Sequence, residues 1–132
     1  MSNAPQRVVI VGDSIAGCTA ARELRALGHE GSVTMISGDP HGSYARPPLS
    51  KRVLAEGAGA SDAWNLSDLS VDTVDGRATS IDVNQRMVTV EEGIHVPYDA
   101  LIVATGAEAR RLAAPGQHGE IVVRTFADAA AL

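Results

Sequence analysis

The feature of the sequence that most constrains the fold is a glycine-containing turn between two apolar segments. Residues 7–11 (RVVIV) are almost all β-branched and apolar, which predicts a strand buried on both faces. Gly12 interrupts this run, residues 15–27 place apolar side chains at helical spacing, and Gly28 stands where a helix is expected to end. A second buried strand is predicted at 33–36. The sequence therefore predicts a βαβ unit of about 30 residues, the minimum unit of a parallel sheet.

The turn itself, GDSIAG at residues 12–17, loosely matches the G-x-G-x-x-G pattern of dinucleotide-binding sites. In that pattern the first glycine makes the tight turn and the third lets helix and strand pack closely. The second lets the backbone approach a pyrophosphate, whose charge the helix N-terminus favours. Gly12 and Gly17 occupy the first and third positions, whereas Ser14 replaces the second with a small side chain whose hydroxyl can donate to a phosphate. The alternative is an ordinary tight turn with nothing bound.

An acidic residue near the end of the second strand completes the pattern, because its carboxylate can bind a ribose hydroxyl group. Asp39 follows the predicted strand end and is the candidate for this role. The alternative is that Asp39 and Pro40 only form a turn.

Composition limits the remaining possibilities. A chain of 132 residues, 45% of them hydrophobic, can form one small domain with a modest core. The formal net charge of −5 argues against nucleic acid, whose phosphates need clustered positive charge. The single cysteine, Cys18, excludes an intramolecular disulfide and is predicted to pack in the core, and the histidines lack metal-site spacing. No signal peptide or membrane-spanning run is recognisable, which favours a cytoplasmic protein.

The rest of the chain is less regular. A loop with two prolines is predicted at 44–49, followed by a short helix that begins at 51–54 and a mobile Gly/Ala/Ser-rich segment at 56–61. The aspartates between residues 62 and 75 are interpreted as a solvated acidic surface. The further predicted elements are a hairpin of 79–83 and 87–90, a short strand at Val96, a buried strand at 100–104, a strand at 121–123 and the start of a helix at 128–132.

Residues 44–51 (YARPPLSK) closely resemble the RPPLSK signature of the bacterial ferredoxin reductases that serve oxygenases and cytochromes P450. Those proteins are FAD enzymes of the pyridine nucleotide–disulfide oxidoreductase superfamily, related to rubredoxin reductases. The segments 8–17, 31–36 and 98–106 are similar to other parts of the same family, and 125–132 resembles the lead-in to its NAD-binding domain. RPPLSK stands where disulfide reductases of the superfamily have C-x-x-x-x-C. The resemblance therefore implies electron transfer to a protein carrier rather than dithiol chemistry.

The resemblance implies roles for individual residues around the phosphates. Gly12, Ser14 and Gly17 would lie against the pyrophosphate of FAD, and Ala16 belongs to the same cofactor-binding turn. Arg46 would neutralise a phosphate.

At the flavin, the resemblance places Pro47 near the ring and Lys51 near its reactive edge. A cation at that edge would stabilise negative charge on a reduced flavin, which makes Lys51 the catalytic candidate. The alternative is a solvated lysine at the start of a helix.

Further cofactor contacts are implied in the second half of the chain. Ala78 matches the place where backbone groups meet the adenine, and Ala104, Thr105 and Gly106 would close over the cofactor. Arg111 is a weaker candidate for a phosphate or flavin contact, with a surface arginine as the alternative.

The expected fold is α/β: a Rossmann-like βαβ FAD-binding domain with a small β-hairpin or meander insertion, incomplete at its carboxy-terminal end. Residues 1–115 would form the first part of the FAD-binding domain, and 116–132 the start of a connection to a NAD-binding domain that the chain lacks. The expected function is that of the FAD-binding part of an NAD(P)H-dependent ferredoxin or rubredoxin reductase. Such an enzyme passes electrons from the nicotinamide through the flavin to an iron–sulfur carrier.

Two alternatives remain open at this point. One is a nucleotide-binding or interaction module without catalysis, which would need a partner chain; an exposed sheet edge would also allow a homodimer. The other is a remnant that binds nothing, for which the replacement of the second glycine by Ser14 is the only sign.

Overall fold

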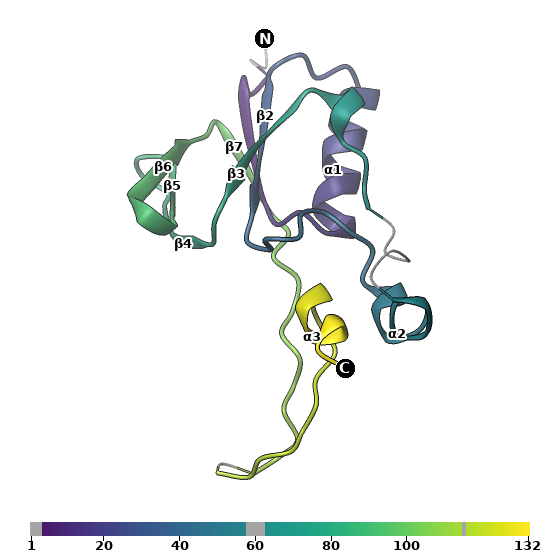
Figure 1. Cartoon of the computed structure of the whole chain (residues 1–132). Helices are drawn as coiled ribbons and strands as arrows, with labels where there is room; N and C mark the ends of the chain where they lie inside the picture. Colours follow the sequence, from purple (N-terminus) through teal and green to yellow (C-terminus); the bar gives the residue numbers. More distant parts are fainter. Residues whose placement is uncertain (1–3, 58–62, 115) are drawn as a thin grey trace.

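The computed structural model describes residues 4–57, 63–114 and 116–132. Within them, four parallel strands form one sheet in the order β3-β2-β1-β7, and three antiparallel strands form a second sheet in the order β4-β5-β6 (Figure 1). The predicted mobile segment 56–61 lies mostly outside the described residues. The predicted α/β fold class, a Rossmann-like parallel sheet with a small antiparallel insertion, is confirmed.

The predicted βαβ unit forms as strand β1 (Arg7–Val11), helix α1 (Ile15–Ala26) and strand β2 (Ser32–Ser37). β1 and β2 are parallel neighbours. Gly28 follows the end of α1 with a φ of 83°, a left-handed conformation that favours glycine after a helix. The periodicity of the apolar side chains therefore predicted both the elements and the helix end.

Side chains of β1 alternate between two cores, which makes the strand the centre of a three-layer structure. Val8 and Ile10 pack with Cys18 and Ala21 of α1 on one face of the parallel sheet. The cluster on the other face joins Val9, Val11 and Ile36 to Val88, Val90, Val96 and Tyr98. The core position predicted for Cys18 is confirmed, since the residue is completely buried.

The antiparallel sheet consists of β4 (Ala78–Asp82), β5 (Met87–Val90) and β6 (Ile94–Pro97). It confirms the predicted hairpin and the short third strand at Val96, which pairs with Val88. A 3-10 turn at Glu91–Gly93 connects β5 to β6. This sheet covers the face of the parallel sheet opposite α1 (Figure 1).

Strand β3 (Val71–Asp75) was not predicted. The solvated acidic surface predicted for this region is confirmed at Asp68, Asp72 and Asp75, which are exposed, whereas Asp62 lies outside the described residues. β3 pairs in parallel with β2 at the edge of the sheet, after a 3-10 turn at Ser67–Leu69. Val71 and Val74 are half-buried, whereas Asp72 and Asp75 are exposed. An edge strand exposes enough of its surface to keep carboxylates in water, so its sequence does not read as apolar.

Strand β7 (Ala100–Val103) lies at the opposite edge and pairs in parallel with β1. Its position confirms the predicted strand, but its predicted full burial is wrong, because Val103 is 60% exposed and the other three residues are only half-buried. In the described part of the chain no strand lies beyond β7. Its apolar run therefore faces solvent along one edge.

The remaining elements are short. A 3-10 turn (Pro47–Ser50) and helix α2 (Arg52–Glu56) follow β2 and confirm the predicted helix start, and helix α3 is Phe126–Ala130, two residues earlier than predicted. The side chains of Thr125 and Asp128 form a capping box at the start of α3. The predicted strand at 121–123 is wrong: these residues pair with no strand among the described elements, and Ile121 is exposed. No described helix has the length and apolar character needed to span a bilayer.

Candidate functional site

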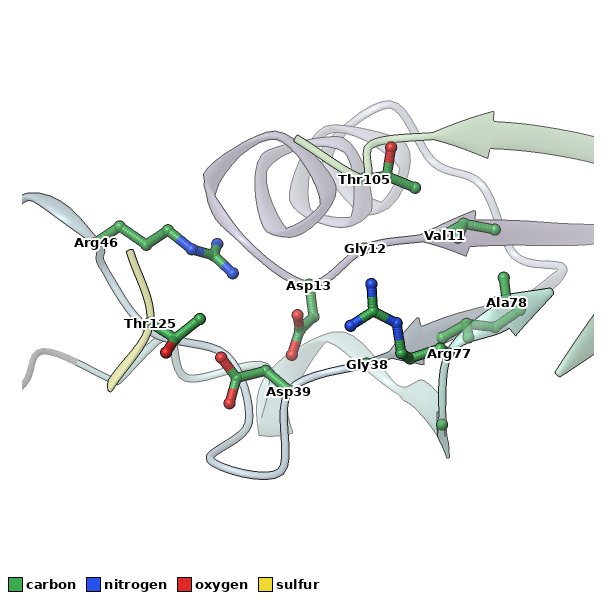
Figure 2. Close-up of a pocket in the computed structure, with 12 residues that line it drawn as sticks. Val11, Gly12, Asp13, Gly38, Asp39, Arg46, Arg77, Ala78, Thr105 and Thr125 are labelled. Atoms are coloured by element: carbon green, nitrogen blue, oxygen red, sulfur yellow. The ribbon is translucent and has the colours of Figure 1, made fainter. Parts of the chain in front are cut away.

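The candidate site lies at the carboxyl ends of β1 and β2, where a cavity of about 230 Å³ opens (Figure 2). This is the edge at which open α/β sheets bind their ligands. Five of the predicted cofactor residues line this cavity together: Gly12, Asp39, Arg46, Ala78 and Thr105. The cavity also borders Asp13, Arg77 and Thr125, which the sequence pattern did not single out.

The two glycines of the turn are fixed by close backbone approaches. Gly12 has a φ of 108°, and a Cβ atom at this position would lie 2.3 Å from the carbonyl oxygen of Ala104. A Cβ on Gly17 would lie 1.9 Å from the carbonyl oxygen of Gly12. Neither position has room for a side chain, so the turn can hold its shape only with glycine at both. These are the tight turn and the close helix–strand packing that the pattern requires.

Ser14 and Ala16 lie at the start of α1. Ser14 is the N-cap residue, and its side chain makes no capping hydrogen bond, so its hydroxyl is available to a ligand. Ala16 is exposed on the first turn of the helix. The amino end of a 12-residue helix carries unpaired N–H groups and a partial positive charge, which favours an anion there.

Asp13 is the residue of this turn that the sequence analysis missed. Its side chain is buried, and its Oδ2 accepts hydrogen bonds from Ser37 Oγ at 2.6 Å and from Ser43 Oγ at 3.3 Å. These bonds tie the turn to the end of β2 and to the following loop. The signal in the sequence was a carboxylate directly after the first glycine, beside an otherwise apolar strand.

Asp39, the predicted ribose ligand, is held from two sides. The hydroxyl of Tyr44 donates to its Oδ2, and its Oδ1 accepts from the backbone N–H of His41 at 3.0 Å and contacts the His41 ring at 3.2 Å. Burial alone would raise the pKa of this carboxyl, but the hydrogen bonds from Tyr44 and His41 outweigh it and lower the pKa below its ordinary value. Asp39 is therefore an ionised acceptor at neutral pH.

Arg46 is the central cation of the site. It lines the cavity beside Gly12, and its guanidinium carbon lies 5.5 Å from the centre of the Tyr44 ring. Its Nε is buried, and it has no hydrogen-bond partner among the described residues. A buried donor without a partner is costly, so this nitrogen marks a place for an acceptor. Arg77, in the turn between β3 and β4, adds a second guanidinium at the same cavity (Figure 2).

Two further cavities adjoin the first through Arg46. An apolar one of about 620 Å³ brings together Ser14, Pro47, Trp64 and Gly106. The other, of about 490 Å³, is more polar and is lined among others by Arg46, Arg77, Thr105, Gly106, Arg111 and Arg124. Arg124, which the sequence analysis did not name, borders both of these cavities.

Three predicted residues contribute little or nothing to these cavities through their side chains. Lys51 is exposed, its Nζ lies 3.4 Å from the carbonyl oxygen of Pro47, and it lines none of the three. Arg111 borders only the polar one, and its guanidinium lies 3.8 Å from Glu120. Ala104 contributes through its backbone, which crosses close to Gly12. The predicted roles of Lys51 and Arg111 stay predictions.

The glycine turn, the helix N-terminus and the carboxylate after β2 define the class of protein as one with a Rossmann-like dinucleotide-binding fold. The family model described as "Pyridine nucleotide-disulphide oxidoreductase" matches residues 6–132. The chain therefore belongs to the pyridine nucleotide-disulphide oxidoreductase family, and the predicted resemblance is confirmed.

Individual relatives show which members of this family the chain is similar to. The chain is 41% identical to the biphenyl dioxygenase system ferredoxin–NAD(+) reductase component of Paraburkholderia xenovorans, over 95% of this chain and 32% of the relative. It is 34% identical to a rubredoxin–NAD(+) reductase of Pseudomonas putida, over 92% of this chain and 34% of the relative. Putidaredoxin reductase, solved in covalent complex with putidaredoxin, superimposes with a TM-score of 0.82 at 30% identity, over 96% of this chain and 33% of that one. The chain thus spans about a third of the length of these proteins.

Proposed function

We propose that this chain holds the ADP part of FAD in an NAD(P)H-dependent ferredoxin or rubredoxin reductase. The observation that carries the proposal is the cavity in which the glycine turn, Asp39, Arg46 and Ala78 meet. The residues of the cavity have the chemical groups that an ADP moiety requires. A pyrophosphate needs a turn without side chains, free N–H groups and a cation, and a ribose needs an ionised acceptor.

Each residue of the site would bind the part of the nucleotide that its charge and hydrogen-bonding groups match. Gly12 and Ser14 would present the turn and the start of α1 to the pyrophosphate, and Arg46 would donate its unpartnered Nε to a phosphate oxygen. Asp39 would accept from ribose hydroxyls, and Ala78 would meet the adenine. The chain has a net charge of −5, so the local cations Arg46 and Arg77 are what make the site favourable for an anion.

When bound, FAD supplies the chemistry of accepting a hydride and releasing single electrons. The protein would orient the flavin through the apolar cavity beside Pro47 and Trp64. Lys51 would add positive charge near the reacting edge, where it stabilises negative charge. Thr105 and Gly106 would close the site from the segment after β7.

The finer parts of the proposal concern the whole protein. Its electron donor would be NAD(P)H and its acceptor an iron–sulfur carrier of the ferredoxin or rubredoxin type, working in the cytoplasm. The names of the relatives support this, since they are ferredoxin–NAD(+) and rubredoxin–NAD(+) reductases, and one solved relative is joined to putidaredoxin. Residues 1–115 would be the FAD-binding part, and 116–132 would lead to the part that binds NAD(P)H.

A titration with FAD, followed by quenching of flavin fluorescence, tests the proposal. We expect saturable binding that ADP displaces. Arg46→Gln should weaken both ligands about tenfold, the size of one hydrogen bond to a charged group. The matched control is Arg86→Gln, which removes the same charge in the turn between β4 and β5 and should leave affinity unchanged. Binding of neither FAD nor ADP would refute the proposal.

A second candidate is a nucleotide-binding module that acts only with a partner chain, such as a second copy of itself in a homodimer. Exposed apolar side chains after the parallel sheet favour it: Leu112 is 85% exposed and Ile121 is 68% exposed. The discriminating measurement is reduction of an artificial electron acceptor by NADH with the purified, FAD-loaded chain. Turnover by this chain alone would refute the module, whereas a homodimer that binds ADP without turnover would support it.

A further inference from the structure

Tyr44 is a buried ionisable side chain that none of the roles above uses. It lies in the loop after β2, is only 4% exposed, and belongs to the small core formed with Leu49, Val53 and Ala129. Its hydroxyl donates to Asp39 Oδ2 and accepts the backbone N–H of Phe126 at 2.9 Å. One oxygen atom thus joins the carboxylate at the cavity to the first residue of α3.

The hydroxyl is suited to remain a donor. Burial, followed by the hydrogen bond to the Asp39 carboxylate, raises the pKa of the Tyr44 phenol to about 12. At neutral pH its proton therefore stays available to Asp39, while the lone pair is engaged by Phe126. Its single proton is therefore committed to Asp39 and is not available to a ligand.

The carboxylate, in contrast, keeps acceptor capacity. Asp39 has two oxygens with about four lone-pair positions; Tyr44 contacts one oxygen and His41 the other. These contacts fix the plane of the carboxylate at the mouth of the cavity, near Thr125 and Arg46 (Figure 2). Without the bond to Tyr44, the side chain would be held by His41 alone.

We propose that Tyr44 is a positioning residue that acts through Asp39: its hydroxyl orients this carboxylate toward ribose hydroxyls and couples the start of α3 to the nucleotide. The inference rests on the proposed nucleotide site. It predicts that the hydroxyl of Tyr44 determines how strongly the site distinguishes a ribose with hydroxyl groups from one without them.

The ring of Tyr44 has a separate, structural role, which allows a clean test. It packs edge-on against Phe126, with ring centres 6.1 Å apart, and against the Arg46 guanidinium. Tyr44→Phe keeps this packing and removes only the hydroxyl. Tyr98→Phe is the matched control, because Tyr98 is also buried but lies in the core between the two sheets.

The experiment compares calorimetric binding of ADP and of 2′,3′-dideoxy-ADP. We expect the unmodified chain to prefer ADP about tenfold, as hydrogen bonds to a charged acceptor imply. Tyr44→Phe should reduce this preference to about twofold, and Asp39→Asn should do the same. Tyr98→Phe should keep it. In the Asp39→Asn background, Tyr44→Phe should cause no further loss of preference.

The outcomes separate the two proposals. If the unmodified chain binds neither nucleotide, the nucleotide site itself is refuted, and the role of Tyr44 is refuted with it. If the chain binds ADP but Tyr44→Phe keeps the full preference, only the inference on Tyr44 is overturned. If the unmodified chain binds ADP without any preference, the inference on Tyr44 is overturned together with the ribose role of Asp39, whereas nucleotide binding itself stands. Tyr44→Phe could also weaken the affinity for both nucleotides equally, and do so again in the Asp39→Asn background. That result would show a merely structural effect and would overturn the inference on Tyr44.

Discussion

The two ends of the candidate site are built in different ways. At the nucleotide end, backbone hydrogen bonds join the turn to its surroundings: Gly12 N–H donates to Ile36 at 3.0 Å, and Ala104 N–H donates to Val11 at 2.8 Å. The segment 104–124 after β7 has no helix or strand among its described residues. Several of its hydrogen bonds use side chains, such as that from Leu112 N–H to Glu120 at 2.6 Å.

The difference indicates which part of the proposed cofactor site is held in place by the two cores. The nucleotide end is formed by parallel strands with a core on each face, so its glycines and carboxylates are held before any ligand arrives. The segment after β7 runs away from the sheet and turns back toward α3, with little contact to either core (Figure 1). We therefore expect the proposed ADP subsite to be preorganised, and the segment after β7 to depend on further contacts for a fixed conformation.

The largest effect that we expect is the difference in stability between two variants, in each of which an isoleucine of one region is replaced by alanine. Ile10 is completely buried in β1, so Ile10→Ala should lower the free energy of unfolding by about 3 kcal/mol. Ile121 is 68% exposed, so Ile121→Ala should change it by less than about 0.5 kcal/mol. Urea unfolding of both variants measures the difference. Equal losses would show that the segment after β7 is as tightly packed as the sheet, which contradicts the comparison.

A second pair of variants sharpens the account of the turn. Gly17→Ala places a methyl group against the backbone of Gly12 and should cost about 2 kcal/mol of stability, together with a loss of ADP affinity. In Gly28→Ala nothing lies within 4 Å of the added carbon, and only the left-handed backbone opposes it, at a cost of about 1 kcal/mol without loss of affinity. Thermal melting and ADP titration separate them. If Gly17→Ala bound ADP with unchanged affinity, the proposed role of the glycine turn in nucleotide binding would be contradicted.

The smallest effect concerns the other end of β1 and depends on pH. Asp99 accepts from the Arg7 side chain at 2.6 Å and from its backbone N–H at 2.8 Å, and these bonds lower the pKa of Asp99 to about 2. The folded-state pKa lies below the unfolded value of 3.8, so the resulting stability is present above about pH 4 and is lost as pH falls to 2. Asp99→Asn should therefore destabilise the protein slightly at pH 7 and not at pH 2. If the stability difference between Asp99→Asn and the unmodified chain grew toward pH 2, the ion pair would not be its cause.

The sequence predicted the parts of the fold in which periodicity and burial agree. The βαβ unit, the glycine at the helix end and the antiparallel strands follow from apolar spacing and turn residues. Strand β3 does not, because Asp72 and Asp75 on an edge strand mask its apolar positions. The strand predicted at 121–123 has the right residue types but no partner strand in the described part of the chain.

The site was predictable to a similar degree. Gly12 and Asp39 were predicted from the dinucleotide-binding pattern and Arg46 from the family resemblance, and the structure brings these three residues to one cavity. Asp13 and Tyr44 were missed because their importance lies in hydrogen bonds to residues distant in the sequence, which no local spacing reveals. Lys51, on an exposed turn away from the cavities, stays a prediction from the family resemblance.

The most direct test of the preorganised nucleotide end is to follow the backbone amide signals of the chain by NMR while ADP is added. We expect shifts at Gly12, Ser14, Asp39 and Ala78, with the signals of Leu112 and Ile121 unchanged. Shifts confined to the segment after β7, or no saturable shift at any of the four residues, would contradict it.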